Sequence, residues 1–209
     1  MIADASAPPL HRRADFKSER RHRPTTPRCA TTLALIICLL GCGAAAQVRH
    51  ADEDQVKAAY LFNFAKFVDW PAGSFSSPND PIVICSIGDE RMAEILRRTV
   101  RGKQVKSRPI EVRQIVALEF KACHILLIAF PDQHQILPIL RGVQASSILT
   151  VGQSNEFTHL GGMINLVRNE DSIELEINPK AADAAGLKIS SRLLAVAHIV
   201  PGQRGGGGL

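Results

Sequence analysis

The chain has 209 residues, of which 45% are apolar and 22% are charged. This balance is typical of a soluble globular protein and excludes a disordered chain or one built mainly of membrane spans. The net charge is +5, but the first 46 residues carry seven of the 25 basic and three of the 20 acidic residues, so residues 47–209 carry 18 and 17. Such a nearly neutral region favours no nucleic-acid partner.

The N-terminal segment has the pattern of a bacterial secretory signal. Several arginines precede the apolar run CATTLALIICLLG, which is short for a membrane span of about 20 residues and is followed by small residues. We therefore predict a leader over residues 1–46 and export of the rest to the periplasm. Two cleavage sites compete. The sequence AAA before Gln47 suits release of a soluble protein, which is the leading interpretation, whereas LLGC resembles a lipobox that would anchor a lipidated Cys42 in a membrane.

Residues 54–70 have the periodicity of a helix, and Pro71 is expected to end it. The stretch from 55 to 75 holds six of the ten aromatic residues of the chain. At helical steps of 100°, most of these rings fall on one broad apolar face, so packing of the helix across a sheet explains them. Phe62 instead falls on the polar side of the helix, among residues such as Lys66 and Asp69.

Beyond a linker over residues 71–81, predicted strands and helices alternate. Strands are expected at 82–88, 109–115, 124–130 and 146–152, with a hairpin of two further strands at 163–178. Helices are expected at 89–100, at 132–143 with an interruption near Pro138, at 155–162, at 179–187 and at 190–200. The glycine-rich residues 203–209 are expected to form a disordered tail.

This alternation predicts an α/β fold. Strands joined by helical crossovers form a largely parallel sheet, and the helices cover both of its faces. The expected architecture is a three-layer sandwich with a mostly parallel mixed sheet, an antiparallel hairpin and one domain over residues 47–202.

Two cysteines remain in a soluble mature protein, Cys85 and Cys123. The periplasm oxidises thiols, so an even pair of cysteines favours a disulfide. The alternative is that both are buried thiols that act as small apolar residues, because both lie in predicted strands.

No catalytic, metal or cofactor site is predicted from motifs. The turn after the strand at 82–88 has a single glycine, and Asp89 and Glu90 would repel a phosphate from the helix that follows. The histidines lack the paired spacing of a zinc site. The common hydrolase motifs are absent from the sequence, and Glu174 and Glu176 are expected to face solvent together on a strand.

Four segments in order resemble the YfiR family of periplasmic proteins. They are QVKAAYLFNFAKFVDWP at 55–71, ILTVGQSNEF at 148–157, GGMINLV at 161–167 with LEIN at 175–178, and AGLKISSRLLAVA at 185–197. The resemblance covers nearly all of residues 54–200.

The resemblance implies a regulator rather than an enzyme. YfiR-like proteins are commonly dimeric. They repress an inner-membrane diguanylate cyclase by binding its periplasmic sensing domain, which lowers cyclic di-GMP and restrains biofilm formation. Redox state can tune that repression. Cys85 and Cys123 look like a family cysteine pair, but no cysteine follows position 123 to form a second pair, so a single structural bond is the alternative to a redox switch.

Two surfaces are candidate sites. Phe62, with Lys66 and Asp69 around it, is a candidate contact to the receptor or to the second copy of a homodimer. Lys188, Arg192 and His198 are candidates for a polar pocket that binds an anion, or they form the solvated side of a helix. The second functional hypothesis is a small-ligand-binding or transport-accessory module, with its pocket at the strand ends near Gly88 and Gly152.

Overall fold

A mostly parallel sheet of eight strands runs through the residues that the computed structural model describes, which are 53–116, 119–144, 146–169 and 172–201. They all belong to the unit Ala45–Leu209, whereas the unit Met1–Ala44 lies outside them. The predicted leader, both cleavage sites, Cys42 and the predicted tail also lie outside the described residues.

The strand order of the sheet is β10-β8-β7-β6-β5-β2-β4-β3. Neighbouring strands are parallel except in the pairs β7–β8 and β3–β4. The strands are β2 (Ile82–Ile87), β3 (Gln104–Val105), β4 (Arg108–Gln114), β5 (Ile125–Ile128), β6 (Leu149–Gly152), β7 (Ile164–Asn169), β8 (Ser172–Ile177) and β10 (His198–Ile199). The predicted mixed sheet and the β7–β8 hairpin are therefore confirmed.

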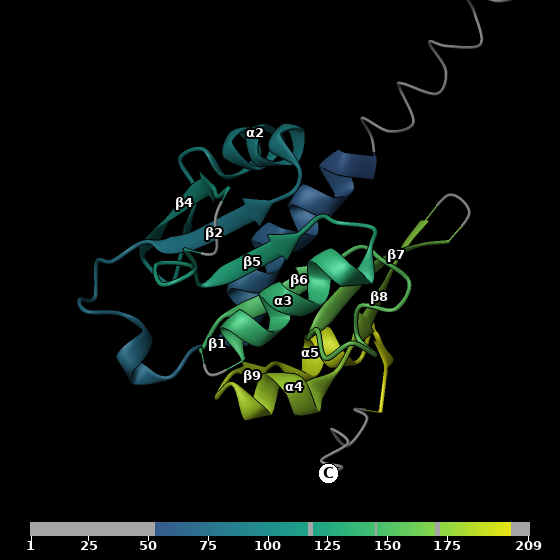
Figure 1. The fold of residues 1–209 in the computed structure, drawn as a ribbon. Coiled ribbons are helices and arrows are strands. Elements are labelled where there is room, and N and C mark those ends of the chain that lie inside the picture. The colour runs from purple at the N-terminus through teal and green to yellow at the C-terminus, as the bar shows by residue number, and fades with distance from the viewer. Residues whose placement is uncertain (1–52, 117–118, 145, 170–171, 202–209) are drawn as a thin grey trace, which may run out of the picture. The chain divides into compact units, whose positions relative to one another are not determined.

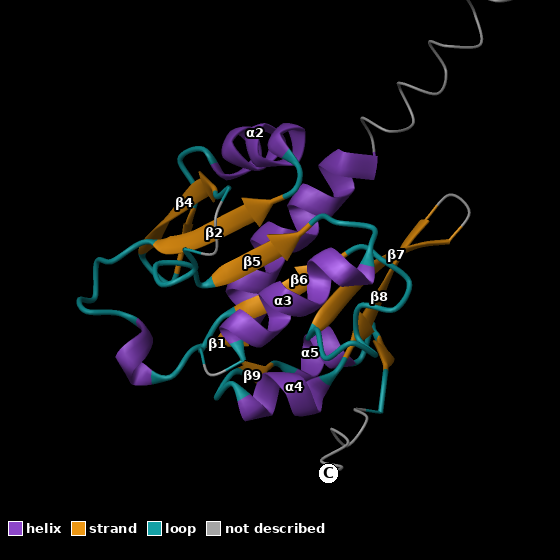
Figure 2. Cartoon of the chain, in the orientation of Figure 1, coloured by secondary structure: helices purple, strands orange, loops and turns teal. Residues whose placement is uncertain are grey.

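Helices cover both faces of this sheet, as Figure 2 shows. They are the helix at residues 53–67 (the aromatic helix), α2 (Glu90–Val100), α3 (Gln133–Val143), α4 (Pro179–Ala184) and α5 (Ser191–Leu194). Alternate residues of the central strands separate two cores. Ile84 of β2 packs with the aromatic helix and α2, whereas Cys85 packs with α3 on the opposite face. The central strands β2 and β5 are buried along their whole length and apolar except for Ser86, because both of their faces are covered.

The aromatic helix is shorter at its C-terminal end than the sequence predicts. It ends at residue 67, and β1 (Val68–Asp69) then pairs antiparallel with β9 (Lys188–Ile189) in a separate two-stranded sheet. The amide of Ser190 also donates to the carbonyl of Phe67 at 2.8 Å. Pairing with β9, which lies some 120 residues away in the sequence, therefore overrides the helical period of residues 68–70.

Three other local predictions are wrong. Helix α3 runs through Pro138 without interruption. Residues 155–161 form turns in place of a helix. The predicted helix at 190–200 is confined to the four residues of α5, and His198 and Ile199 extend the sheet as β10, parallel to β8. In the last case, pairing with the exposed edge of β8 again replaces a local helical pattern.

Candidate functional site

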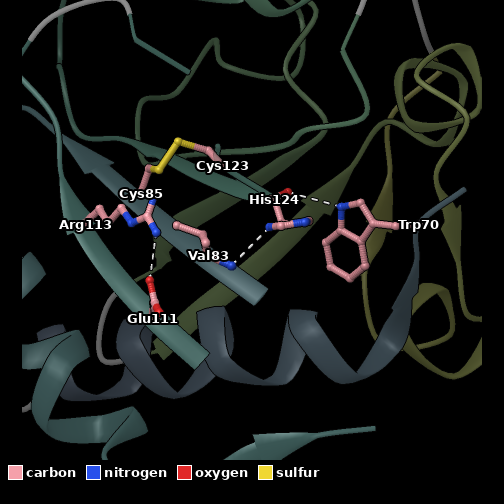
Figure 3. Close-up of a disulfide and its surroundings, with 7 residues drawn as sticks. All are labelled: Trp70, Val83, Cys85, Glu111, Arg113, Cys123 and His124. Carbon is pink, nitrogen blue, oxygen red and sulfur yellow. Dashed lines mark hydrogen bonds and ion pairs between the residues drawn. A yellow bond between two sulfur atoms is a disulfide. The ribbon is translucent and has the colours of Figure 1, made fainter. Parts of the chain in front are cut away.

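The predicted disulfide is present and joins the central strand to the segment before its neighbour. Cys85 lies in β2, and Cys123 comes two residues before β5, with 5.7 Å between their Cα atoms. Both side chains are buried against the α3 core. The bond closes a loop that contains α2, β3 and β4, and it joins β2 to the segment before β5, its neighbouring strand in the sheet (Figure 3).

His124, the residue after Cys123, joins the strands to the linker at 71–81. Its Nδ1 accepts from the Val83 amide at 3.1 Å, and its Nε2 is 3.0 Å from the Ser74 carbonyl. An amide can only donate, so Nδ1 carries no proton and Nε2–H donates to Ser74. The indole of Trp70 donates to the His124 carbonyl at 3.3 Å (Figure 3), and the Phe75 ring stacks on the imidazole at 4.4 Å. The sequence contains no motif that distinguishes His124 from the other histidines.

Burial lowers the pKa of His124 below its ordinary value of 6.5; the bond to Ser74 opposes the shift and the nearby Arg108 reinforces it. Between the lowered pKa and 6.5, the unfolded chain binds a proton that the folded protein excludes. Acid therefore favours the unfolded state in this window, and His124 contributes stability that is lost as the pH falls from 6.5.

We expect the free energy of unfolding to be lower at pH 5 than at pH 7.5, and His124→Gln to reduce this difference. The reason is that a proton on Nδ1 would point at the Val83 N–H, so this hydrogen bond would be replaced by repulsion between two donors. Urea titrations at both pH values measure the effect. His134 is exposed on α3, so His134→Gln is the matched control and should leave the difference unchanged. An equal effect of the two variants would contradict the assignment to His124.

A groove of about 640 Å³ lies where the parallel strands β2, β5 and β6 begin. Its walls include Asp80, Arg113, Lys121 and His124, and Cys123 of the disulfide lines it. Ligands of open α/β sheets usually bind at the opposite, carboxyl ends of the strands. This groove is therefore not the pocket that the ligand-binding hypothesis predicts.

A second cavity, of about 520 Å³, does lie at carboxyl ends, after β5 and β6. Amides and carboxylates line it above the apolar Ile136 and Leu160. The residues after Gly152 contribute to it, but Gly88 does not, because the Phe130 ring fills the space beside Gly88 at 3.0 Å from the position of a Cβ. Its polar wall residues are Asp132, Gln133, Gln153, Ser154, Asn155 and Glu156.

A buried polar network holds the turns at 155–161 on the sheet beside this cavity. Asn165 is buried and donates to the Ser154 carbonyl at 2.8 Å and to Glu176 at 3.1 Å. Thr158 also donates to Glu176, and Asn178 donates to the Thr158 carbonyl. The expectation that Glu176 simply faces solvent is therefore wrong, because this half-buried carboxylate anchors the turns.

The structure brings the three candidate contact residues to one region. Phe62 is half-buried against the core of the aromatic helix, with the ammonium of Lys66 at 4.2 Å from its ring centroid and that of Lys103 at 4.6 Å. Asp69 lies on β1 and pairs with Lys106. Phe62 is thus covered by two lysine side chains rather than freely exposed.

The residues of the predicted anion pocket lie on different elements. Lys188 is on β9, in register with Asp69 of β1; Arg192 is in α5; and His198 is on β10, in the eight-stranded sheet. All three are exposed, and none of them lines the two cavities above. The pocket stays a prediction.

A family profile described as YfiR/HmsC-like matches residues 54–198. The chain belongs to this family. No curated protein matches the chain. Among solved structures, it is similar to a Streptococcus pneumonia ABC domain in complex with L-Trp, with 10% identity and a TM-score of 0.44 over 57% of this chain and 55% of that chain. The chain thus spans about half of that domain's length, and this distant likeness carries no argument.

Membership in the YfiR/HmsC-like family supports, in general terms, a regulatory role. YfiR-like proteins are periplasmic, act on diguanylate cyclase signalling through the periplasmic domain of a partner, and are not known enzymes. Within the described part of the chain, no group of three metal-ligating side chains is placed to hold an ion. None of the helices described there is long and apolar enough to span a membrane.

Proposed function

We propose that this YfiR-like protein is a periplasmic regulatory binding protein that represses an inner-membrane diguanylate cyclase by binding its periplasmic sensing domain. It thereby lowers cyclic di-GMP and restrains biofilm formation, and it acts as a homodimer. The observation that carries this proposal is the family match over residues 54–198.

Repression of this kind needs no catalytic residue. The repressor must bind the inactive arrangement of the cyclase more tightly than the active one. A differential affinity of about 5.5 kcal/mol moves a two-state equilibrium from 1:99 to 99:1. The required feature is a rigid surface with specific contacts, and the aromatic helix offers one because its buried face fixes it on the sheet.

The effect of the gene on cyclic di-GMP tests the proposal. We expect deletion to raise the cyclic di-GMP level and the exported wild-type protein to restore it. An unchanged level, under conditions where the gene is expressed, would reject repression of a cyclase.

We further propose that Phe62, Lys66 and Asp69 form the contact to the receptor or to the second copy. Phe62→Glu should abolish restoration of the cyclic di-GMP level or self-association. The substitution removes the aromatic ring, and the new carboxylate would pair with Lys66 and Lys103. The melting temperature should change little, since Phe62 is only half-buried. Val116→Glu is the matched control, at an exposed apolar position outside the aromatic helix. A folded Phe62→Glu protein with normal repression and normal self-association would rule out this contact.

The cavity near Gly152 favours one alternative function, a small-ligand-binding or transport-accessory module. Its amide and carboxylate walls suit a neutral polyol or an amine rather than an anion. A thermal-shift screen of small polar compounds tests this alternative, with Gln153→Ala, in the cavity wall, as the variant that should weaken any stabilisation. A neighbouring gene for a membrane-bound cyclase would favour the first function, and one for a transporter the second.

A further inference from the structure

Residues 91–113 are strongly basic although the domain as a whole is nearly neutral. They hold eight of the 18 basic and only two of the 17 acidic residues in residues 47–209. The remaining residues of that range are therefore net acidic. Averaging over the whole range hides this asymmetry, and a strongly asymmetric charge distribution marks an electrostatic binding surface.

The fold gathers this segment at one end of the sheet. It comprises α2, β3 and most of β4, and β4 and β3 are the last strands in the sheet order. In Figure 1, α2 and β4 lie next to each other, away from α4 and α5. We call four exposed bases, from the last turn of α2 and from the residues on either side of β3, the basic edge, which consists of Arg98, Arg101, Lys103 and Lys106.

Most of these charges are free to bind a partner. Several bases of the segment are already neutralised, for example Arg91 by Asp54 and Arg113 by Glu111. In contrast, Arg98, Arg101 and Lys103 form no ion pair with any residue that the structure describes. Lys106 pairs only with Asp69, and both of these side chains are exposed.

The turn between β3 and β4 supports a role for charge. Lys106 and Ser107 form a two-residue turn and adopt φ angles of 51° and 65°. Hairpin turns of this kind favour Asn-Gly, because most side chains are strained in the left-handed region. The backbone conformation therefore does not explain a lysine at this position.

The surroundings of the basic edge favour a diffuse anionic surface over a protein partner. Protein interfaces have apolar centres that are depleted in lysine. The large apolar side chains that are exposed among the described residues are Val56, Val116, Val196 and Ile199. None of them belongs to the basic edge, and the ring of Phe62 lies under Lys66 and Lys103. Flexible bases with no exposed large apolar side chain among them suit lipid headgroups, which present negative charge without a fixed shape.

We propose that the basic edge binds the anionic phospholipid headgroups of a membrane surface. This interaction goes beyond the proposed repression and does not depend on it. The candidate contact at Phe62 adjoins the basic edge through Lys103. A protein held in this way would present Phe62 close to the membrane, where the periplasmic domain of a membrane receptor emerges.

Sedimentation with phospholipid vesicles tests the proposal. Each base near an anionic bilayer strengthens binding by about fivefold. The protein is recovered from the periplasm of an expressing host and carries Cys42→Ala, which removes the candidate lipid anchor. It should sediment with vesicles of phosphatidylcholine and phosphatidylglycerol, but not with phosphatidylcholine alone. The triple variant Arg98→Gln, Arg101→Gln, Lys103→Gln should bind at least about tenfold more weakly.

A second triple variant, Lys121→Gln, Arg141→Gln, Lys180→Gln, is the matched control. It loses the same charge at exposed positions outside the basic edge that form no ion pair within the described residues. We expect it to bind as the parent protein does, and melting temperatures verify that both variants fold. Equal binding by the two triple variants would overturn the proposal. So would retention of the parent protein on immobilised polyglutamate but not on the vesicles, which would assign the edge to an acidic polypeptide.

Discussion

Gly152→Ala should destabilise the protein by about 3 kcal/mol, at the upper end of the usual cost of overpacking a core. A Cβ at this position would lie 2.1 Å from Cγ of Phe157, whose side chain is fully buried. The same ring also occupies the space where a Cβ on Gly162 would lie, at 2.1 Å, so both glycines leave room for it. The free energy of unfolding in urea measures the effect.

Gly73→Ala is the matched control for this prediction. A Cβ at Gly73 meets no atom within 4 Å, and its φ is not in the left-handed region. We expect its free energy of unfolding to change by less than about 1 kcal/mol. If Gly152→Ala also leaves the free energy of unfolding unchanged, the inference that Phe157 leaves no room for a Cβ at this position is wrong.

A double variant separates the clash from other effects of the substitution. Phe157→Leu removes part of the ring, so Gly152→Ala should cost less in that background than alone. A coupling energy of about 1 kcal/mol or more between the two changes would be typical of residues in direct contact. If the free-energy changes of the two substitutions simply add, the cost of Gly152→Ala does not arise from contact with Phe157.

Removal of the disulfide is the second large effect. The double variant Cys85→Ala, Cys123→Ala should lose about 4 kcal/mol of stability, because the bond closes a loop with a sequence separation of 38 and loop closure restricts the unfolded chain. Alanine avoids the unpaired hydroxyl that serine would bury beside the α3 core.

Chemical reduction provides the control for the disulfide. A reducing agent should destabilise the wild-type protein by a similar amount and leave the double variant unchanged. Restoration of cyclic di-GMP levels by the double variant then distinguishes the two roles that the sequence leaves open. Normal repression at a temperature where the variant is folded indicates a structural bond, and altered repression indicates a redox switch.

The fold class follows from local patterns. The mainly apolar runs at Ile82–Ile87 and Ile125–Ile128 predict strands buried on both faces, and the amphipathic segments between strands predict the covering helices. The helix expected at 89–100 is α2, and Asp89 caps it, because its carboxylate accepts from the Met92 amide at 2.9 Å. These features depend on residues close together in the sequence, so the sequence reveals them.

The sites are less predictable, because they depend on contacts between distant segments. The helical period puts Phe62 on the polar side of its helix, whereas the structure has it half-buried against the core of that helix. Lys103, which covers its ring, comes from the β3 side of the sheet. His124 was one histidine among several, and only the linker carbonyl of Ser74 and the Val83 amide give it a role. The excess of basic residues in 91–113 is visible in the sequence, but the nearly equal numbers of basic and acidic residues over the whole range 47–209 do not reveal it.

The sequence by itself determined the alternation of strands and helices and the family, since burial and period are local properties, and it left one possible pair of cysteines in residues 47–209. The tertiary structure decided that Cys85 and Cys123 are bonded, because it brings their Cα atoms to 5.7 Å. Only the tertiary structure decided where the aromatic helix ends, that His198 and Ile199 form an edge strand, and that Phe157 requires Gly152 and Gly162. Each of these depends on a partner that becomes a neighbour only when the chain folds. Local preferences of about 1 kcal/mol per residue are too small to oppose such pairing and packing.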